Sequence, residues 1–67
     1  MKFRLLTPVK RQPASIAPYF YMLAAGRTVH LVQRHNAVLM SVSTIENPAD
    51  RIAEDIFHIS ASEAEAV

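Results

Sequence analysis

The chain opens with alternating apolar and basic residues. Phe3 and Leu5 recur every second position, a period typical of a strand with one buried face. This pattern predicts a strand over residues 2–7. Pro8 lacks a backbone N–H, so it ends the strand or marks a sheet edge. The following segment, 8–18, carries proline at both ends and in its middle, which predicts a loop.

Three short segments rich in apolar residues follow the loop. Aromatic and β-branched residues favour strands over 19–25, 28–34 and 37–43. Gly26–Arg27 suits a two-residue hairpin turn with glycine first, and His35–Asn36 is a second candidate. These features predict a three-stranded meander. A brief helix over 19–25, beginning after a proline and ending at glycine, is the alternative.

Two-residue turns fix the strand register, and the register decides which side chains share a face. The predicted register places Val29 opposite Val42, Leu31 opposite Met40 and Gln33 opposite Val38. One face is then apolar except for Gln33, and contains Phe20, Met22, Ala24, Val29, Leu31, Val38, Met40 and Val42. The opposite face is mixed, and its candidate partner-binding residues are Tyr19, Tyr21, Leu23, His30, Val32, Arg34 and Leu39.

The last third of the chain carries the features of a helix start. Asn47 is a good N-cap and Pro48 suits the first helical position. Ile52 and Ile56 recur four residues apart, as on one side of a helix. A helix from 48 to about 58 is therefore predicted.

Two continuations of this helix are open. The helix can run on to the C-terminus, or Ser60 and Glu63 can cap a second short turn. The expected fold class is α+β, in one domain spanning 1–67. It is a small antiparallel sheet, made of the meander and an N-terminal edge strand, with one C-terminal helix packed on one face.

Length and composition limit how such a fold is stabilised. A chain of 67 residues buries only about 60% of its unfolded surface, so its core is small. The chain contains no cysteine, which excludes disulfides and thiolate zinc sites. The same absence fits a reducing compartment, so we expect the cytoplasm. The apolar run over 13–26 is too short to cross a bilayer, and no membrane association is expected.

The net charge of +1 conceals an uneven distribution. Residues 1–45 contain six basic and no acidic residues, whereas residues 46–67 contain one basic and six acidic residues. One interpretation is a basic binding face with an acidic tail. The other is intramolecular, with an acidic helix lying against a basic sheet.

No residue pattern indicates catalysis. The histidines His30, His35 and His58 show no ligand spacing typical of a metal site, and no serine has the context of a nucleophile. The only glycine is Gly26, which excludes a glycine-rich phosphate loop. We therefore expect no enzymatic activity, no cofactor and no metal.

The first functional hypothesis is a small non-enzymatic protein-binding module. Tyrosine and arginine are frequent at interface centres, and a helix on the apolar face leaves the mixed face open. Unless 8–18 or the C-terminal tail covers that face, a partner is expected to do so. Such a module acts as a regulator or inhibitor that occupies a surface on a larger protein, as antitoxins and virus-encoded inhibitors of host proteins do. A homodimer is one form.

The alternative hypothesis is nucleic-acid binding through the same sheet. Tyr19 and Tyr21 would stack on bases. The phosphates would be neutralised by Arg4, Lys10, Arg11, Arg27 and Arg34. Steep loss of affinity with salt distinguishes this hypothesis from a hydrophobic protein interface.

Overall fold

The structure is a computed structural model that describes residues 1–15 and 17–67. Its strands are β1 (Lys2–Leu5), β2 (Val9–Arg11), β3 (Tyr21–Leu23), β4 (Thr28–Arg34), β5 (Leu39–Ser43), β6 (Ile56–Ser60) and β7 (Ala64–Ala66). Its helical segments are the 3-10 turns η1 (Pro48–Asp50), η2 (Ala53–Asp55) and η3 (Ala61–Glu63). Among the described residues, no helix reaches the length and apolar character that crossing a bilayer requires.

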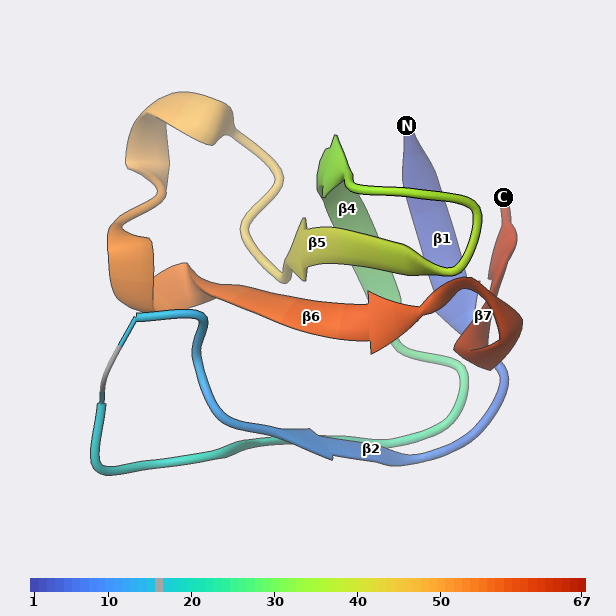
Figure 1. Ribbon diagram of the computed structural model, residues 1–67, viewed down its shortest axis with the longest axis horizontal. Coiled ribbons are helices and arrows are strands. Elements are labelled where there is room, and N and C mark those ends of the chain that lie inside the picture. The colour runs from blue at the N-terminus through green and yellow to red at the C-terminus, as the bar shows by residue number, and fades with distance from the viewer. Residues whose placement is uncertain (16) are drawn as a thin grey trace.

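The strands form two antiparallel sheets. A five-stranded sheet has the order β6-β5-β4-β1-β7, and a separate two-stranded sheet pairs β2 with β3. In Figure 1, β5 and β6 run across the direction of β4, β1 and β7, so the larger sheet is strongly twisted. The β2–β3 ribbon, by which we mean this two-stranded sheet, lies on the far side of β6 from β5.

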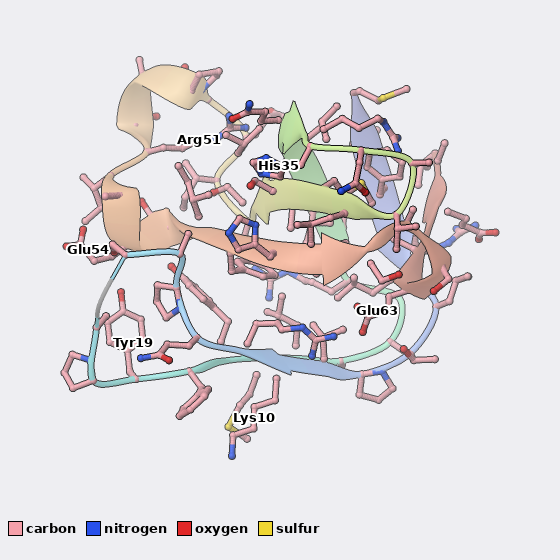
Figure 2. The ribbon with its side chains drawn as sticks, viewed as in Figure 1. Lys10, Tyr19, His35, Arg51, Glu54 and Glu63 are labelled. Atoms are coloured by element: carbon pink, nitrogen blue, oxygen red, sulfur yellow. The ribbon has the colours of Figure 1, made fainter. Side chains whose placement is uncertain are left out.

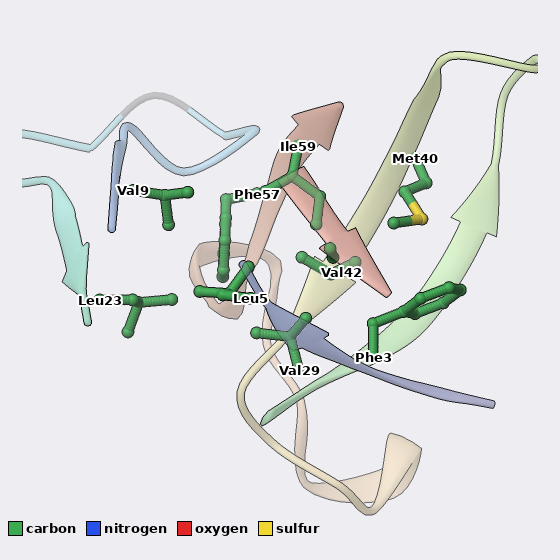
Figure 3. Packing of buried hydrophobic residues seen from close by; sticks show 10 residues of the cluster. Phe3, Leu5, Val9, Leu23, Val29, Met40, Val42, Phe57 and Ile59 are labelled. Atoms are coloured by element: carbon green, nitrogen blue, oxygen red, sulfur yellow. The ribbon is translucent and has the colours of Figure 1, made fainter. Parts of the chain in front are cut away.

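One hydrophobic core joins the two sheets. Val9 and Leu23 from the ribbon pack with side chains of the larger sheet, as Figure 3 shows. The remaining buried members are Phe3, Leu5, Val29, Met40, Val42, Phe57, Ile59 and Ala64. The ribbon therefore closes the core on the side that the larger sheet leaves open.

The first strand is confirmed in part. β1 buries Phe3 and Leu5 and exposes Lys2 and Arg4, which alternate with them, as the pattern predicts. Its place in the sheet differs, because β1 lies between β4 and β7 instead of at an edge. The C-terminal residues form the strand β7, which pairs with β1; neither predicted continuation of the helix beyond residue 58 includes a strand here.

The predicted C-terminal helix is wrong, and the fold is therefore mostly β, not α+β. Asn47 does cap a turn, because its side chain accepts a hydrogen bond from the Ala49 N–H over 3.1 Å, and Pro48 begins that turn. The turn ends after three residues, since Arg51 is extended with ψ of 140°. The Arg51 guanidinium donates to the carbonyls of Ile45 (2.7 Å) and Glu46 (3.0 Å), which holds this loop in shape.

Residues 56–60 form a strand because they alternate with a period of two. Phe57 and Ile59 are buried, whereas the residues beside them are half-buried on the other face. Pairing with β5 places Ile59 opposite Met40 and Phe57 opposite Val42. A helix here would leave the N–H and C=O groups along this edge of β5 unpaired, at a cost in free energy. The expectation of a second short turn capped by Ser60 and Glu63 is confirmed by η3.

The predicted meander is wrong in its first hairpin. β3 pairs with β2, not with β4, so residues 8–18 include a strand where a loop was predicted. Gly26 does lie in a turn, with φ of +89°, and the Arg27 N–H donates to the Ala24 carbonyl over 3.2 Å. This turn carries the chain from one sheet to the other, because the Gly26 N–H bonds to the Leu5 carbonyl on β1 over 2.8 Å.

The second hairpin forms, but in a different register. Leu31 pairs with Val42 and Arg34 with Met40, and a β-bulge shifts the register between Leu31 and Gln33. The turn is longer than two residues because Asn36 Oδ1 accepts hydrogen bonds from the N–H groups of residues 38 and 39, both at 2.8 Å. Val29, Met40 and Val42 still face the core together.

The faces of β3 are reversed relative to the prediction. Phe20, just before the strand, and Met22 are exposed, whereas Leu23 is buried and Tyr21 is half-buried. The pairing of Val9 with Leu23 explains the reversal, because both apolar side chains can enter the core only if this side of the ribbon faces inward. The predicted arrangement, in which a helix covers Phe20 and Met22 and leaves the tyrosines open, is replaced by a ribbon whose Tyr21 ring stacks on Phe57 of β6.

Candidate protein-binding surface

The outer side of the ribbon carries apolar side chains in water. Met22 is 76% exposed and Phe20 is 53% exposed. The neighbouring strand contributes Lys10, which lies directly opposite Met22 in the register. We call this surface the ribbon face, and define it as Pro8, Lys10, Phe20, Met22 and Ala24, all of which are exposed.

The ribbon face has a defined shape. A shallow groove of about 400 Å³ follows it and is lined by Pro8, Val9, Lys10, Met22, Leu23 and Ala24. The Lys10 ammonium lies 5.0 Å from the centre of the Phe20 ring, within the range of a cation–π contact. Figure 2 shows Lys10 pointing away from the larger sheet. The surface therefore combines two large apolar side chains with one positive charge.

The inner side of the ribbon is fixed to the rest of the molecule by tyrosines. The Tyr21 ring stacks on Phe57 with centroids 4.8 Å apart, and its hydroxyl donates to the Glu54 carbonyl. Tyr19 packs edge-on against Tyr21 at 5.9 Å, and Figure 2 shows it pointing from the chain before β3 toward Glu54. These contacts hold the ribbon in place, so the ribbon face is preorganised.

Tyr21 also makes the stability of the protein depend on pH in the alkaline range. Burial, followed by the charge of Asp55 3.3 Å away, raises the pKa of Tyr21 to about 12. An unfolded tyrosine has a pKa of about 10. The unfolded state thus loses this proton first, so the stabilisation is complete below about pH 10 and is lost as the pH rises through about 12.

We expect Tyr21→Phe to be less stable than wild type at neutral pH and to approach it as the pH rises. The lost hydrogen bond costs about 1 kcal/mol near pH 8. Above about pH 10, the variant does not share the loss that ionisation of Tyr21 causes in wild type. Urea unfolding at pH values from about 8 to 11.5 measures both effects. A difference between the two proteins that stays constant with pH would contradict the assignment.

The predicted partner-binding residues do not share one face. Leu23 is in the core. The hydroxyls of Tyr19 and Tyr21 point to the Glu54 carbonyl. The ribbon that carries Tyr21 is a separate sheet from the one that contains β4 and β5. The other predicted residues lie on β4 and at the start of β5. His30 lines a depression near both chain ends.

The last three of these residues are exposed around the β4–β5 hairpin. Val32 lies at the bulge of β4, Arg34 ends that strand and Leu39 begins β5. Leu39 pairs with Ser60 across the β5–β6 ladder. They thus lie on the larger sheet, while the tyrosines belong to the ribbon.

Two of the predicted phosphate-binding residues are in ion pairs. Arg4 contacts Glu65 over 2.7 Å, and Arg11 contacts Glu63. The acidic end of the chain therefore lies against its basic beginning, as the intramolecular interpretation of the charge pattern predicts, although through a strand and a 3-10 turn instead of a helix. The remaining candidates are Lys10, Arg27 and Arg34.

Phe20 and Met22, which the predicted register places on the covered apolar face, are exposed instead. The missed signal lies in Val9-Lys10-Arg11, where an apolar residue precedes a charged one within the predicted loop. A strand there is the partner with which β3 pairs, and the outward position of Lys10 places Met22 outward as well. Because β3 carries large apolar residues on both sides, its own pattern does not decide which side is buried.

Among the described residues, no three histidine, cysteine, aspartate or glutamate side chains cluster closely enough to hold a metal ion. Comparison with protein-family models, curated proteins and solved structures finds no match to this chain.

Proposed function

We propose that this protein is a non-enzymatic protein-binding module whose ribbon face occupies a surface on a larger protein. The observation that supports this most is the exposure of Phe20 and Met22 side by side with Lys10 on a fixed ribbon. Scattered single apolar residues are normal on protein surfaces, but a contiguous group is typical of an interaction site. The proposal includes a cytoplasmic location, on the absence of cysteine.

The chemistry of the ribbon face suggests the character of the partner surface. Phe20 and Met22 are large apolar groups that would fill a shallow pocket on the partner. Methionine is adaptable in shape and is frequent at such interfaces. Lys10 adds a positive charge beside Phe20 and opposite Met22. The expected partner site is therefore an apolar depression with a carboxylate nearby, and the bound protein would act by blocking it.

The test compares three forms of the protein in affinity capture from the native host. We expect Phe20→Ser/Met22→Ser to lose the partner that wild type captures. Val38→Ser is the matched control, because Val38 is also an exposed apolar residue but lies in the β4–β5 turn. Equal capture by the ribbon-face variant and the control would contradict the proposal.

Two further measurements distinguish a protein partner from the two other ligands considered for this surface, a second copy of the chain and a nucleic acid. If light scattering shows a dimer that only the ribbon-face variant dissociates, the occupant is a second copy of the chain. If capture disappears after nuclease treatment, or falls steeply between low and moderate salt, nucleic acid is the ligand. Either result replaces the proposed partner class.

A further inference from the structure

The depression near both chain ends lies on a part of the surface that shares no residue with the ribbon face. Its volume is about 490 Å³, within the range of sites that hold small organic molecules. The polar side chains that line it are Lys2, His30, Glu46 and Arg51, and the apolar ones include Leu31 and Pro48. We call it the terminal depression. It combines residues from β1, β4 and the loop after β5.

Strand pairing holds two of these side chains next to each other. Lys2 of β1 lies directly opposite His30 of β4. The adjoining residues form the hydrogen bond, from the Leu31 N–H to the Met1 carbonyl over 2.9 Å. Lys2 and His30 are thus a non-hydrogen-bonded pair, in which side chains approach most closely. An ammonium and an imidazole therefore lie together at this edge of the depression.

Arg51 is fixed in the loop after β5 by two backbone carbonyls. Its Nε donates to the Ile45 carbonyl over 2.7 Å, and its Nη2 donates to the Glu46 carbonyl over 3.0 Å. A guanidinium has five N–H donors, so three remain beyond these two bonds. The half-buried side chain is thus preorganised, and its planar group matches the two oxygens of a carboxylate.

The side chains that line the depression leave a surplus of one positive charge. Lys2 and Arg51 are positive, whereas Glu46 is negative. An amino group at Met1 and a carboxylate at Val67 cancel, so they do not alter this sum. Across the described part of the chain, no group of opposite charge lies within ion-pair distance of Lys2, Arg51 or Glu46. The charges that line the depression are therefore available to a ligand.

We propose that the terminal depression binds a small organic carboxylate that carries a hydroxyl group. Its carboxylate contacts Lys2 and Arg51, and its hydroxyl donates to the Glu46 carboxylate. Its apolar body packs on Leu31 and Pro48. A singly charged ligand matches the surplus of one positive charge, whereas a doubly charged phosphate is repelled more strongly by Glu46. This inference does not depend on the function of the ribbon face.

NMR titration of the tag-free, isotope-labelled protein tests the proposal. The probes are sodium 3-phenyllactate and sodium 3-phenylpropionate, which differ by one hydroxyl group. We expect both to shift the amide signals of Lys2, His30 and Arg51 in a saturable way. The affinity for 3-phenyllactate should be higher by about twofold to tenfold, which corresponds to one hydrogen bond.

Two variants show whether the charges of the depression are responsible. Lys2→Gln should weaken the binding of both probes by about tenfold, because it removes a charged contact. Arg34→Gln is the matched control, since Arg34 is an exposed basic residue at the far end of β4, and it should bind like wild type. Equal weakening in the two variants would show a general attraction of anions and would overturn the proposal.

Glu46→Ala tests the role assigned to the hydroxyl group. Loss of the acceptor should remove the preference for 3-phenyllactate, whereas loss of the negative charge should leave the affinity for 3-phenylpropionate unchanged or higher. A preference that persists in this variant contradicts the assigned orientation of the ligand. Absence of saturable shifts up to about 10 mM of either probe, or tighter binding of inorganic phosphate than of 3-phenyllactate, also overturns the proposal.

Discussion

Phe57→Ala should leave most of the protein unfolded at 25 °C. Phe57 is fully buried on β6, opposite Val42 and against the Tyr21 ring, and Figure 3 shows it between the ribbon side chains and the other core residues of the larger sheet. Truncating such a phenylalanine costs about 3–5 kcal/mol. In a domain of this size, a single small core rarely supplies more than about 3–5 kcal/mol of stability.

Urea unfolding followed by circular dichroism measures this loss. Phe57→Leu keeps much of the apolar volume and should retain a folded state with an intermediate midpoint. Val38→Ala is the exposed control, and we expect it to lie within about 0.5 kcal/mol of wild type. If Phe57→Ala were to unfold at the same urea concentration as Val38→Ala, the core would not be centred on β6.

Glu63→Ala should lower the free energy of unfolding by about 2 kcal/mol, because this one carboxylate accepts hydrogen bonds from two parts of the chain. Its Oε1 accepts the Ser60 N–H over 2.8 Å at the start of η3, and its Oε2 contacts the Arg11 guanidinium on β2. Both bonds are charge-assisted and partly shielded from solvent, where such bonds contribute most. The truncation therefore frays η3 and loosens the ribbon at the same time.

Glu65→Ala provides the matched control for this carboxylate. Its partner Arg4 is about half exposed, as is Glu65 itself, and exposed ion pairs contribute about 0–1 kcal/mol. Raising the salt concentration should reduce the small effect at Glu65 more than the effect at Glu63. Equal losses in the two variants, measured by urea unfolding, would show that the Glu63 carboxylate does not join the two regions.

Local sequence patterns predicted the parts of the fold that local interactions decide. The alternation around Phe3, the glycine of the Ala24–Arg27 turn and the Asn47 cap are all confirmed. Each of these features depends on the backbone preference of a few consecutive residues, and no distant contact opposes that preference. The capping of a short turn by Ser60 and Glu63 belongs to the same group.

Elements that depend on distant pairing were not predictable in the same way. Ile52 and Ile56 are four residues apart, as in a helix, but Phe57 and Ile59 follow with a period of two. The choice between the two patterns is made by β5, which needs a partner along its free edge. For the same reason, the pairing of Val9 with Leu23, and not the pattern within β3, decides that Met22 faces solvent.

The candidate sites follow from these distant pairings. The ribbon face exists only because β2 takes β3 as its partner, and Ser41 lies beside His58 only because residues 56–60 form a strand. When one strand is absent from the prediction, the surface that this strand builds is absent as well.

The ladder between β1 and β7 has a consequence for how the chain folds during synthesis. Arg4 and Glu65 face each other across this ladder although 61 positions separate them in the sequence. While a ribosome still encloses residues 64–66 in its exit tunnel, β1 has only β4 as a neighbour, and its other edge stays exposed. We expect the nascent chain to remain open to chaperones and to edge-to-edge association until residues 64–66 have left the exit tunnel.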